Sequence, residues 1–263
     1  MQQALYEQVI AIASAAGDEI MGVYQRDFGI EHKADNSPLT EADLAAHAII
    51  ENGLRSLSVK LPVLSEESAD IDWGTRKDWS EYWLVDPLDG TKEFIKKNGE
   101  FTVNIAHIID GVPVWGVVVA PALGVTYHGG TAIGKSFKRD IDDKVIEVAD
   151  LPVENTGWCI VGSRSHQSDE FLEFVRQFDN PAITSMGSSL KICLVATGEA
   201  HLYPRLGLTS EWDTAAAHAV LNGAGGKLVV MDSGKPLAYN QEENILNPFF
   251  LAAPLNYKAS PSP

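Results

Sequence analysis

The stretch WLVDPLDGTKEF at residues 83–94 constrains this chain most, because it joins an apolar, strand-like run to two carboxylates at a break in the pattern. Proline lacks a backbone N–H, so we predict that the strand ends at Asp86-Pro87. Asp86 and Asp89 would then lie at the strand end, where the carbonyl oxygen of Leu88 can turn inward. Such hard oxygen ligands suit Mg²⁺ or Ca²⁺ better than zinc. The competing interpretation is a plain Asp-Gly turn, which needs no ligand.

The residues after these acids extend the same hypothesis. Gly90 would let a phosphate approach the backbone, and a helix beginning near Thr91 would present its N–H groups to that phosphate. Phosphatases that form an aspartyl-phosphate typically place one residue between their two aspartates, whereas Pro87 and Leu88 both intervene here. The spacing therefore favours water over a carboxylate as the nucleophile.

The composition narrows the class of protein. The 263 residues are 45% hydrophobic, enough for a core, and the formal net charge of -16 argues against a nucleic-acid partner. Residues 111–134 carry no charged side chain, but two prolines and six glycines there favour successive buried strands over a membrane span. We interpret Cys159 and Cys193 as buried thiols in a reducing compartment. Because residues 1–22 form no signal-peptide pattern, we predict a cytoplasmic location.

Two amphipathic helices are expected in the first quarter of the chain. Apolar residues recur at helical spacing over residues 5–23, which predicts a helix that ends before Gly29. Residues 31–39 form a polar loop, and a second helix begins near Thr40. Asp43 lies on the apolar stripe of that helix. It can close a capping box with Thr40 or act as an orienting base that faces a cleft, and the pattern fits both interpretations equally.

The next segments continue a sheet. Glu66 and Glu67 follow a short apolar run, and a solvated loop is the favoured interpretation unless a cation offsets their like charges. Strand-like runs follow at residues 101–109, 113–120 and 124–128. Residues 135–154 are weakly patterned, so we place a domain boundary there: residues 1–145 form an α+β metal-binding domain, and residues 146–263 an α/β domain that completes the site.

The second half contains α/β units. A strand at 158–161, a Gly/Ser loop and a helix at 168–178 form one of them. The turn Gly187-Ser188-Ser189 then opens another helix, whose N–H groups could bind an anion while Lys191 adds positive charge. Asp213 occupies the first turn of an Ala-rich helix over residues 211–226, where it could simply complement the helix dipole.

Several of these motifs resemble one family. The segments SEE at 65–67, DPLDGT at 86–91 and WDTAAAHAVLNGAGG at 212–226 resemble the three signatures of the inositol monophosphatase superfamily, in the same order and over most of the chain. A closer resemblance, to the bacterial CysQ-type branch of 3'(2'),5'-bisphosphate nucleotidases, rests on KADNSPLTEAD at 33–43, VLSEE at 63–67, DGTKEFIKKNGEFTVNIA at 89–106, GSRSH at 162–166 and GSSLK at 187–191.

The resemblance implies a fold and a reaction. The fold would be an α/β layered αβαβα sandwich, and the reaction the Mg²⁺-dependent, lithium-sensitive hydrolysis of the 3'-phosphate of adenosine 3',5'-bisphosphate or its 5'-phosphosulfate form. Two or three Mg²⁺ ions would be held by Glu66, Asp86, the carbonyl of Leu88, Asp89 and Asp213. Asp43 and Thr91 would orient the attacking water. The substrate would contact Glu66, Leu88, Asp89, Gly90, Thr91, Ser163, His166, Ser188, Lys191 and Asp213.

Two other functions fit part of the same pattern. An inositol or sugar phosphate phosphatase would share every metal ligand but would not need Ser163, His166 or Lys191. A Ca²⁺ or phosphoanion binding module could use the same acids but would not need Thr91 beside Asp43. The expected partner is a small nucleotide bisphosphate, and the sequence leaves open both the oligomeric state and a peripheral association with the inner membrane.

Overall fold

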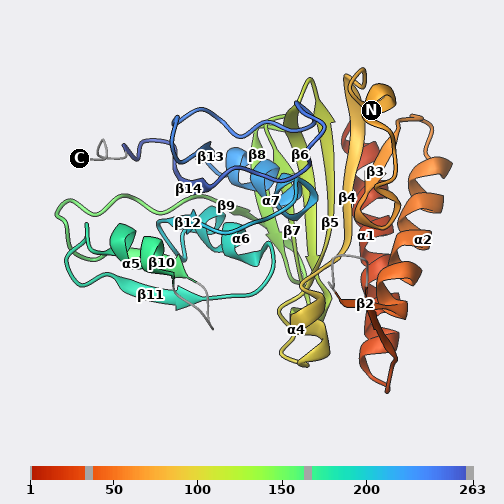
Figure 1. Cartoon of the computed structure of the whole chain (residues 1–263), viewed down its shortest axis with the longest axis horizontal. Helices are drawn as coiled ribbons and strands as arrows, with labels where there is room; N and C mark the ends of the chain where they lie inside the picture. The colour runs from red at the N-terminus through yellow and green to blue at the C-terminus, as the bar shows by residue number, and fades with distance from the viewer. Residues whose placement is uncertain (1, 33–37, 163–167, 259–263) are drawn as a thin grey trace.

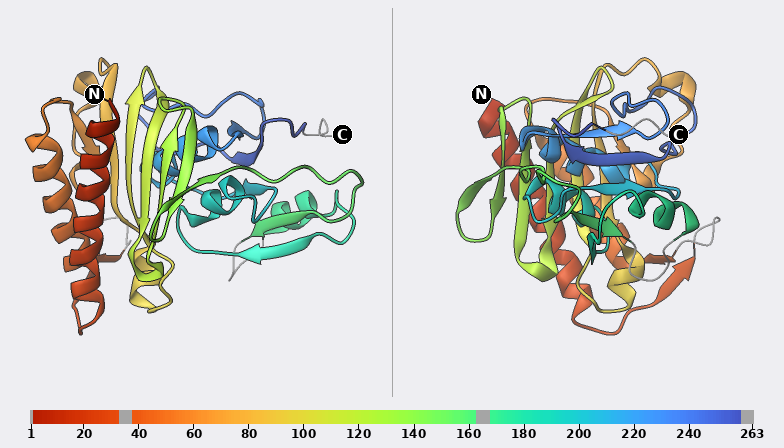
Figure 2. Two further views of the ribbon diagram at one scale, coloured as in Figure 1. Left: turned by 180° about the vertical axis from the view of Figure 1, so that it is seen from behind. Right: turned by 90° about the vertical axis from the view of Figure 1, so that its left-hand side faces the viewer.

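The computed structural model describes residues 2–32, 38–162 and 168–258 and shows five alternating layers (Figure 1). Helices α1 (Gln2–Tyr24) and α2 (Glu41–Ser56) form one outer layer on a large sheet. Helices α6 (Leu190–Ala196) and α7 (Trp212–Gly223) cover the opposite face of that sheet. Smaller sheets follow, with α5 (Asp169–Val175) packed on them, and the same order is visible from behind in Figure 2. The predicted αβαβα sandwich is confirmed.

The large sheet has seven strands in chain order, with only the first pair parallel. The strands are β3 (Val63–Ser65), β4 (Glu81–Asp89), β5 (Thr102–Ile109), β6 (Val112–Ala120), β7 (Val125–Gly130), β8 (Lys135–Arg139) and β9 (Asp143–Ile146). Alternate residues of a strand point to opposite faces. Trp83 and Val85 therefore pack toward α1 and α2, whereas Tyr82 and Leu84 pack toward α6 and α7. Both faces of β4 are buried, which explains its continuous apolar run.

Pro87 does not end β4 as predicted. The strand continues to Asp89, with a register shift between Asp86 and Asp89 against β5. On the other side, β3 pairs only with Trp83 to Val85, so no strand needs a hydrogen bond from residue 87 there. A proline at such an irregular, one-sided strand end costs little. The consequence for the site is the same, because both aspartates still lie at the end of the paired segment.

Two other segments differ from the sequence-based expectation. The polar loop at residues 31–39 contains the ends of a small hairpin, since β1 (Ile30–His32) pairs antiparallel with β2 (Pro38–Thr40). The weakly patterned segment after residue 135 holds β8 and β9, which extend the large sheet. Short, half-exposed strands carry little periodicity, so neither was visible in the sequence. The domain boundary after residue 145 stays a prediction.

The C-terminal part contains two further sheets. Strands β10 (Cys159–Gly162) and β11 (Ala182–Ser185) pair in parallel, and β12 (Tyr203–Arg205), β14 (Phe250–Pro254) and β13 (Gly226–Val230) form an antiparallel sheet in that order. Short elements include α3 (Trp73–Arg76) and α4 (Thr91–Ile95), as well as the 3-10 turns Glu66–Ser68 and Pro121–Leu123. Among the described residues, no helix is long and apolar enough to span a membrane. Cys193 is buried as predicted, but Cys159 is only half-buried.

Gly116 sets the distance between β6 and the helix that carries Asp213. A Cβ atom at this glycine would lie 2.4 Å from the backbone oxygen of Ala216 and 2.8 Å from its Cα, both within α7. Backbone atoms of a buried helix cannot yield as a side chain can. The absence of a side chain at Gly116 therefore allows α7 to pack at its observed depth.

We expect Gly116→Ala to destabilise the protein by about 1–3 kcal/mol, the usual cost of overpacking a filled core. The matched control is Gly22→Ala in α1, where an added Cβ meets nothing within 4 Å. That change should be neutral or stabilise by a few tenths of a kcal/mol. Denaturant unfolding of both variants measures the difference, and an undiminished stability of Gly116→Ala would contradict the packing argument.

Candidate metal centre

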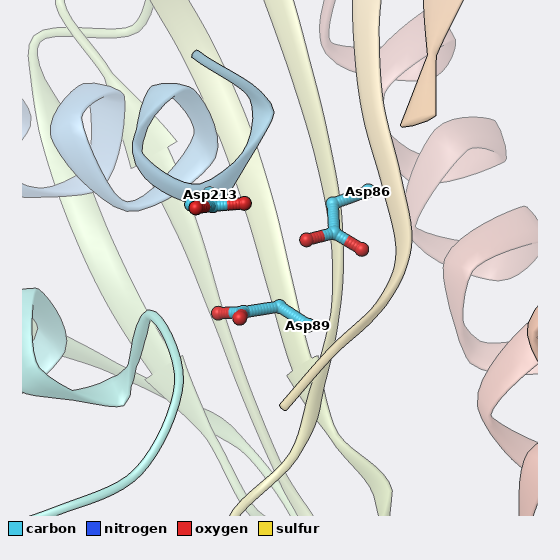
Figure 3. Close-up of side chains that lie close together, drawn as sticks. All are labelled: Asp86, Asp89 and Asp213. Atoms are coloured by element: carbon cyan, nitrogen blue, oxygen red, sulfur yellow. The ribbon is translucent and has the colours of Figure 1, made fainter. Parts of the chain in front are cut away.

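Three aspartates from two distant segments meet at one point of the structure. Asp86 and Asp89 come from the end of β4, and Asp213 comes from the first turn of α7. One carboxylate oxygen of each lies within 4.8 Å of the others, and the three side chains point into one space between strand and helix (Figure 3). A plain Asp-Gly turn at Asp89 and a helix-dipole role for Asp213 therefore do not account for this convergence.

The electrostatics of this cluster fit a cation. Burial raises the pKa of Asp86 well above its ordinary value, and the charges of Glu66, Asp89 and Asp213 raise it further. Burial also raises the pKa of Asp213 to about 8, with Asp89 as the next cause, and the pKa of Asp89 to about 6. Converging buried carboxylates are unfavourable without positive charge. Their hard oxygen atoms match the ligands preferred by Mg²⁺ and Ca²⁺, so the residues fit a divalent metal.

Glu66 and the Leu88 carbonyl lie beside this cluster. Glu66 begins a half-buried 3-10 turn and lines the same cavity as Asp89 and Asp213, so the solvated-loop interpretation was wrong. Its charge raises the pKa of all three aspartates. The Leu88 carbonyl accepts a hydrogen bond from Thr91 Oγ1 at 3.3 Å. The structure thus brings every predicted metal ligand to one region, with the three aspartates as its tightest group.

The capping-box interpretation of Asp43 is confirmed, and its orienting role stays a prediction. Its Oδ2 accepts from the backbone N–H and the hydroxyl of Thr40, each at 2.7 Å, and completes the capping box of α2. Its Oδ1 lies 3.3 Å from the Thr91 hydroxyl, whose single proton can be donated to this oxygen or to the Leu88 carbonyl, also 3.3 Å away. A buried carboxylate held in this way can orient the Thr91 hydroxyl.

The Gly-Ser turn before α6 is used differently from the prediction. The backbone N–H of Gly187 donates to Glu100 Oε2 at 2.8 Å, and that of Ser189 donates to Asp89 Oδ2 at 2.5 Å. These two donors are therefore engaged by protein carboxylates and are not offered to an outside anion. The Lys191 ammonium also lines the cavity, and its charge lowers the pKa of Asp89. Lys191 remains the anion-binding candidate of this turn.

Arg205 is a site residue that the sequence analysis missed. It lies on β12, lines the cavity, and its charge lowers the pKa of Asp213. One guanidinium nitrogen donates to the Leu208 carbonyl at 2.9 Å, while the buried Nε has no hydrogen-bond partner among the described residues. A three-residue strand gives no motif to recognise. The nearest signal was a basic residue a few positions before Asp213.

The cavity that joins these groups has a volume of about 920 Å³. Its lining includes Gly90, Thr91 and Ser188, the predicted ligands Glu66, Asp89 and Asp213, and the cations Lys92, Lys96, Lys191 and Arg205. Sites for small ligands commonly measure roughly 300–1,000 Å³, so a nucleotide-sized molecule is admissible. Ser163 and His166, the two remaining predicted substrate contacts, lie outside the described residues.

A comparison with protein families agrees with these features. The model of the inositol monophosphatase family matches residues 1–258, which include every acid of the site. The match covers the strand end with Asp86 and Asp89 and the helix with Asp213.

Individual relatives cover nearly the whole chain. The protein named 3'(2'),5'-bisphosphate nucleotidase CysQ in Escherichia coli strain K12 is 51% identical over 250 residues, which cover 94% of this chain and 98% of that one. The protein of the same name in Salmonella typhimurium is 52% identical with the same coverage. Among solved structures, CysQ from Bacteroides thetaiotaomicron shares 37% identity with a TM-score of 0.83, covering 98% of this chain and 99% of that chain.

Proposed function

The chain belongs to the inositol monophosphatase family, and we infer that it is an enzyme, a 3'(2'),5'-bisphosphate nucleotidase. It hydrolyses the 3'-phosphate of adenosine 3',5'-bisphosphate to give AMP and phosphate. The observation that carries this assignment is one cavity lined by two members of the three-aspartate cluster, Asp89 and Asp213, and by cations that include Lys191 and Arg205. The name shared by relatives about half identical over 94% of the chain supports the same substrate.

Mg²⁺ is the proposed cofactor, as two or three ions, and its ligands would be Glu66, Asp86, the Leu88 carbonyl, Asp89 and Asp213. When bound, the metal lowers the pKa of water and offsets charge on the leaving oxygen. The protein's part is to hold these oxygens in one place. Asp89 is itself oriented by the Ser189 N–H, and Asp213 by the Ser210 N–H at 2.9 Å.

Other residues of the chain orient the reactants. The Thr91 hydroxyl donates to Asp43, and its oxygen accepts a hydrogen bond from the attacking water, which orients that water. Lys191 and Arg205 bind the 5'-phosphate that does not react, and this remote contact can be used at the reacting centre. On a chain with a net charge of -16, the cavity is nevertheless lined by four cationic side chains, Lys191 and Arg205 among them, which favours an anionic ligand.

The alternative substrates are less well supported. An inositol or sugar monophosphate offers no second phosphate for Lys191 and Arg205. A binding module would have no use for a threonine hydroxyl directed by a buried carboxylate. The cytoplasm stays part of the proposal, and the free thiols of Cys159 and Cys193 are consistent with a reducing compartment.

Phosphate release from a panel of substrates with Mg²⁺ tests the assignment. We expect kcat/KM to be highest for adenosine 3',5'-bisphosphate and much lower for 3'-AMP and inositol 1-phosphate. A panel in which inositol 1-phosphate is the best substrate would replace the nucleotidase assignment with the general phosphatase.

Thr91→Ala should lower kcat roughly 10-fold, less than the loss of a full proton-transfer group, because the bound metal would still hold the water. Thr91 is the cleaner position to change, since a substitution at Asp43 would also remove the cap of α2. Thr91→Ser retains the hydroxyl and is the matched control. Steady-state kinetics and Mg²⁺ titration measure the result. An increase in KM with unchanged kcat would show that Thr91 does not direct the water.

A further inference from the structure

Two leucines are exposed at the rim of the cavity. Leu208 is 70% exposed and Leu246 is 42% exposed, and both line the cavity that holds the acids and the cations. Singly exposed leucines are ordinary on a protein surface, but these two line the same cavity as the acids and cations, where a bound ligand can cover them. Neither the metal-binding role of the acids nor the phosphate-binding role of the cations involves these two leucines.

The loops that carry these leucines are joined to each other by hydrogen bonds. Ser210 and Leu246 form an antiparallel bridge, and the Glu211 N–H donates to the Ile245 carbonyl at 2.9 Å. The backbone of Asn247 donates to the Thr209 carbonyl at 2.8 Å. Its side-chain amide donates to the Ser210 carbonyl at 2.7 Å. The two leucines are therefore presented from a fixed pair of loops.

The same segment also connects the rim to the charged groups. A guanidinium nitrogen of Arg205 donates to the Leu208 carbonyl at 2.9 Å. Three residues before Asp213, the Ser210 N–H donates to the carboxylate of that aspartate at 2.9 Å. Residues 205–213 thus supply a cation, an apolar side chain and an acid to one cavity, in that order.

We propose that Leu208 and Leu246 form the contact surface for the nucleobase of the substrate. This inference rests on the proposed nucleotidase function. A nucleoside 3',5'-bisphosphate carries three groups on one ribose: the 3'-phosphate belongs at the acids, the 5'-phosphate at the cations, and the flat apolar face of the base on the leucines. The free energy of an apolar contact grows with the area that it buries, so the larger purines are preferred over pyrimidines.

The experiment compares two substrates that differ only in the base. These are adenosine 3',5'-bisphosphate and methyl ribofuranoside 3,5-bisphosphate, which keeps both phosphates. The double variant Leu208→Ser/Leu246→Ser should lose roughly 10-fold or more in kcat/KM on the nucleotide, as expected when apolar contacts to a substrate are removed. On the sugar bisphosphate it should match the wild type. The matched control is Leu255→Ser, because Leu255 is 66% exposed but lies outside the cavity lining.

The possible outcomes separate this inference from the function on which it rests. Equal losses on the two substrates, or no loss on either, would overturn the nucleobase contact while the nucleotidase assignment stands. A wild type that releases phosphate from neither bisphosphate would overturn the proposed function and the contact with it. A loss confined to the nucleotide, with an unaffected Leu255→Ser variant, supports the contact.

Discussion

Removal of divalent metal with a chelator is expected to reduce phosphate release to background, and addition of Mg²⁺ to restore it. The reason is the buried cluster of Asp86, Asp89 and Asp213, whose convergence has no other evident purpose. Ca²⁺ should not restore activity, because its larger radius and looser coordination displace the reacting groups from alignment. Full activity with Ca²⁺ alone would contradict a tightly aligned site.

The variant Asp213→Asn extends this prediction to the protein itself. Loss of one carboxylate ligand should lower kcat/KM by roughly 1,000-fold or more, which excess Mg²⁺ cannot recover in full, because charge stabilisation in the transition state is lost. The change should also stabilise the metal-free protein. Burial raises the pKa of Asp213 to about 8 in the folded protein from its ordinary value of 3.8, so its ionised form disfavours folding above pH 3.8.

The gain in stability follows from the sign of that shift. The contribution of Asp213 to the stability of the metal-free wild type should fall as pH rises from 3.8 toward about 8. At pH 8, Asp213→Asn should be more stable than the wild type by at least about 1 kcal/mol. The gain is a lower bound, since a pKa shift of one unit already corresponds to about 1.4 kcal/mol. Thermal unfolding in chelator measures this, with the exposed Asp142→Asn as control. A destabilised Asp213→Asn without metal would show that the cluster is not under repulsion.

The acids of the site were predictable because each belongs to a local pattern. Asp86 and Asp89 lie at the end of a buried apolar strand, and Asp213 lies in the first turn of an Ala-rich helix, so their places in the chain were visible from periodicity and turn residues. Their proximity in space was not visible from the sequence. It depends on how closely α7 approaches β6, which is set by Gly116 against Ala216.

What the sequence could not show lies where tertiary contacts override a local signal. The N–H groups of Gly187 and Ser189 looked available to an anion, but carboxylates from distant segments occupy them. Pro87 looked like a strand end, but the strand continues because its neighbour on one side has already stopped. Arg205 gains its significance only from the cavity that it lines.

Lys191→Ala should remove most of the preference for a bisphosphate over a monophosphate. In this cavity the ammonium is held by the Ser188 carbonyl at 3.0 Å. With two N–H groups of the turn occupied, a 5'-phosphate must rely on the cations of the cavity, and Lys191 and Arg205 are the two whose charges act on Asp89 and Asp213. A charge-assisted hydrogen bond of this kind contributes about 1.5–3 kcal/mol. The loss corresponds to roughly 10- to 150-fold in kcat/KM.

The measurement is kcat/KM on adenosine 3',5'-bisphosphate and on 3'-AMP, for the wild type and for two variants. Lys191→Met keeps the length of the side chain near the Tyr203 ring, 6.0 Å away, so it separates charge from packing. Removing the ammonium also raises the pKa of Asp89, whose charge Lys191 offsets, and so weakens the metal site. That effect is common to both substrates and cancels in their ratio. Only the bisphosphate carries a group for Lys191 to bind. A ratio unchanged in Lys191→Ala and Lys191→Met would therefore show that Lys191 does not bind the second phosphate, which would leave it to the other cations of the cavity.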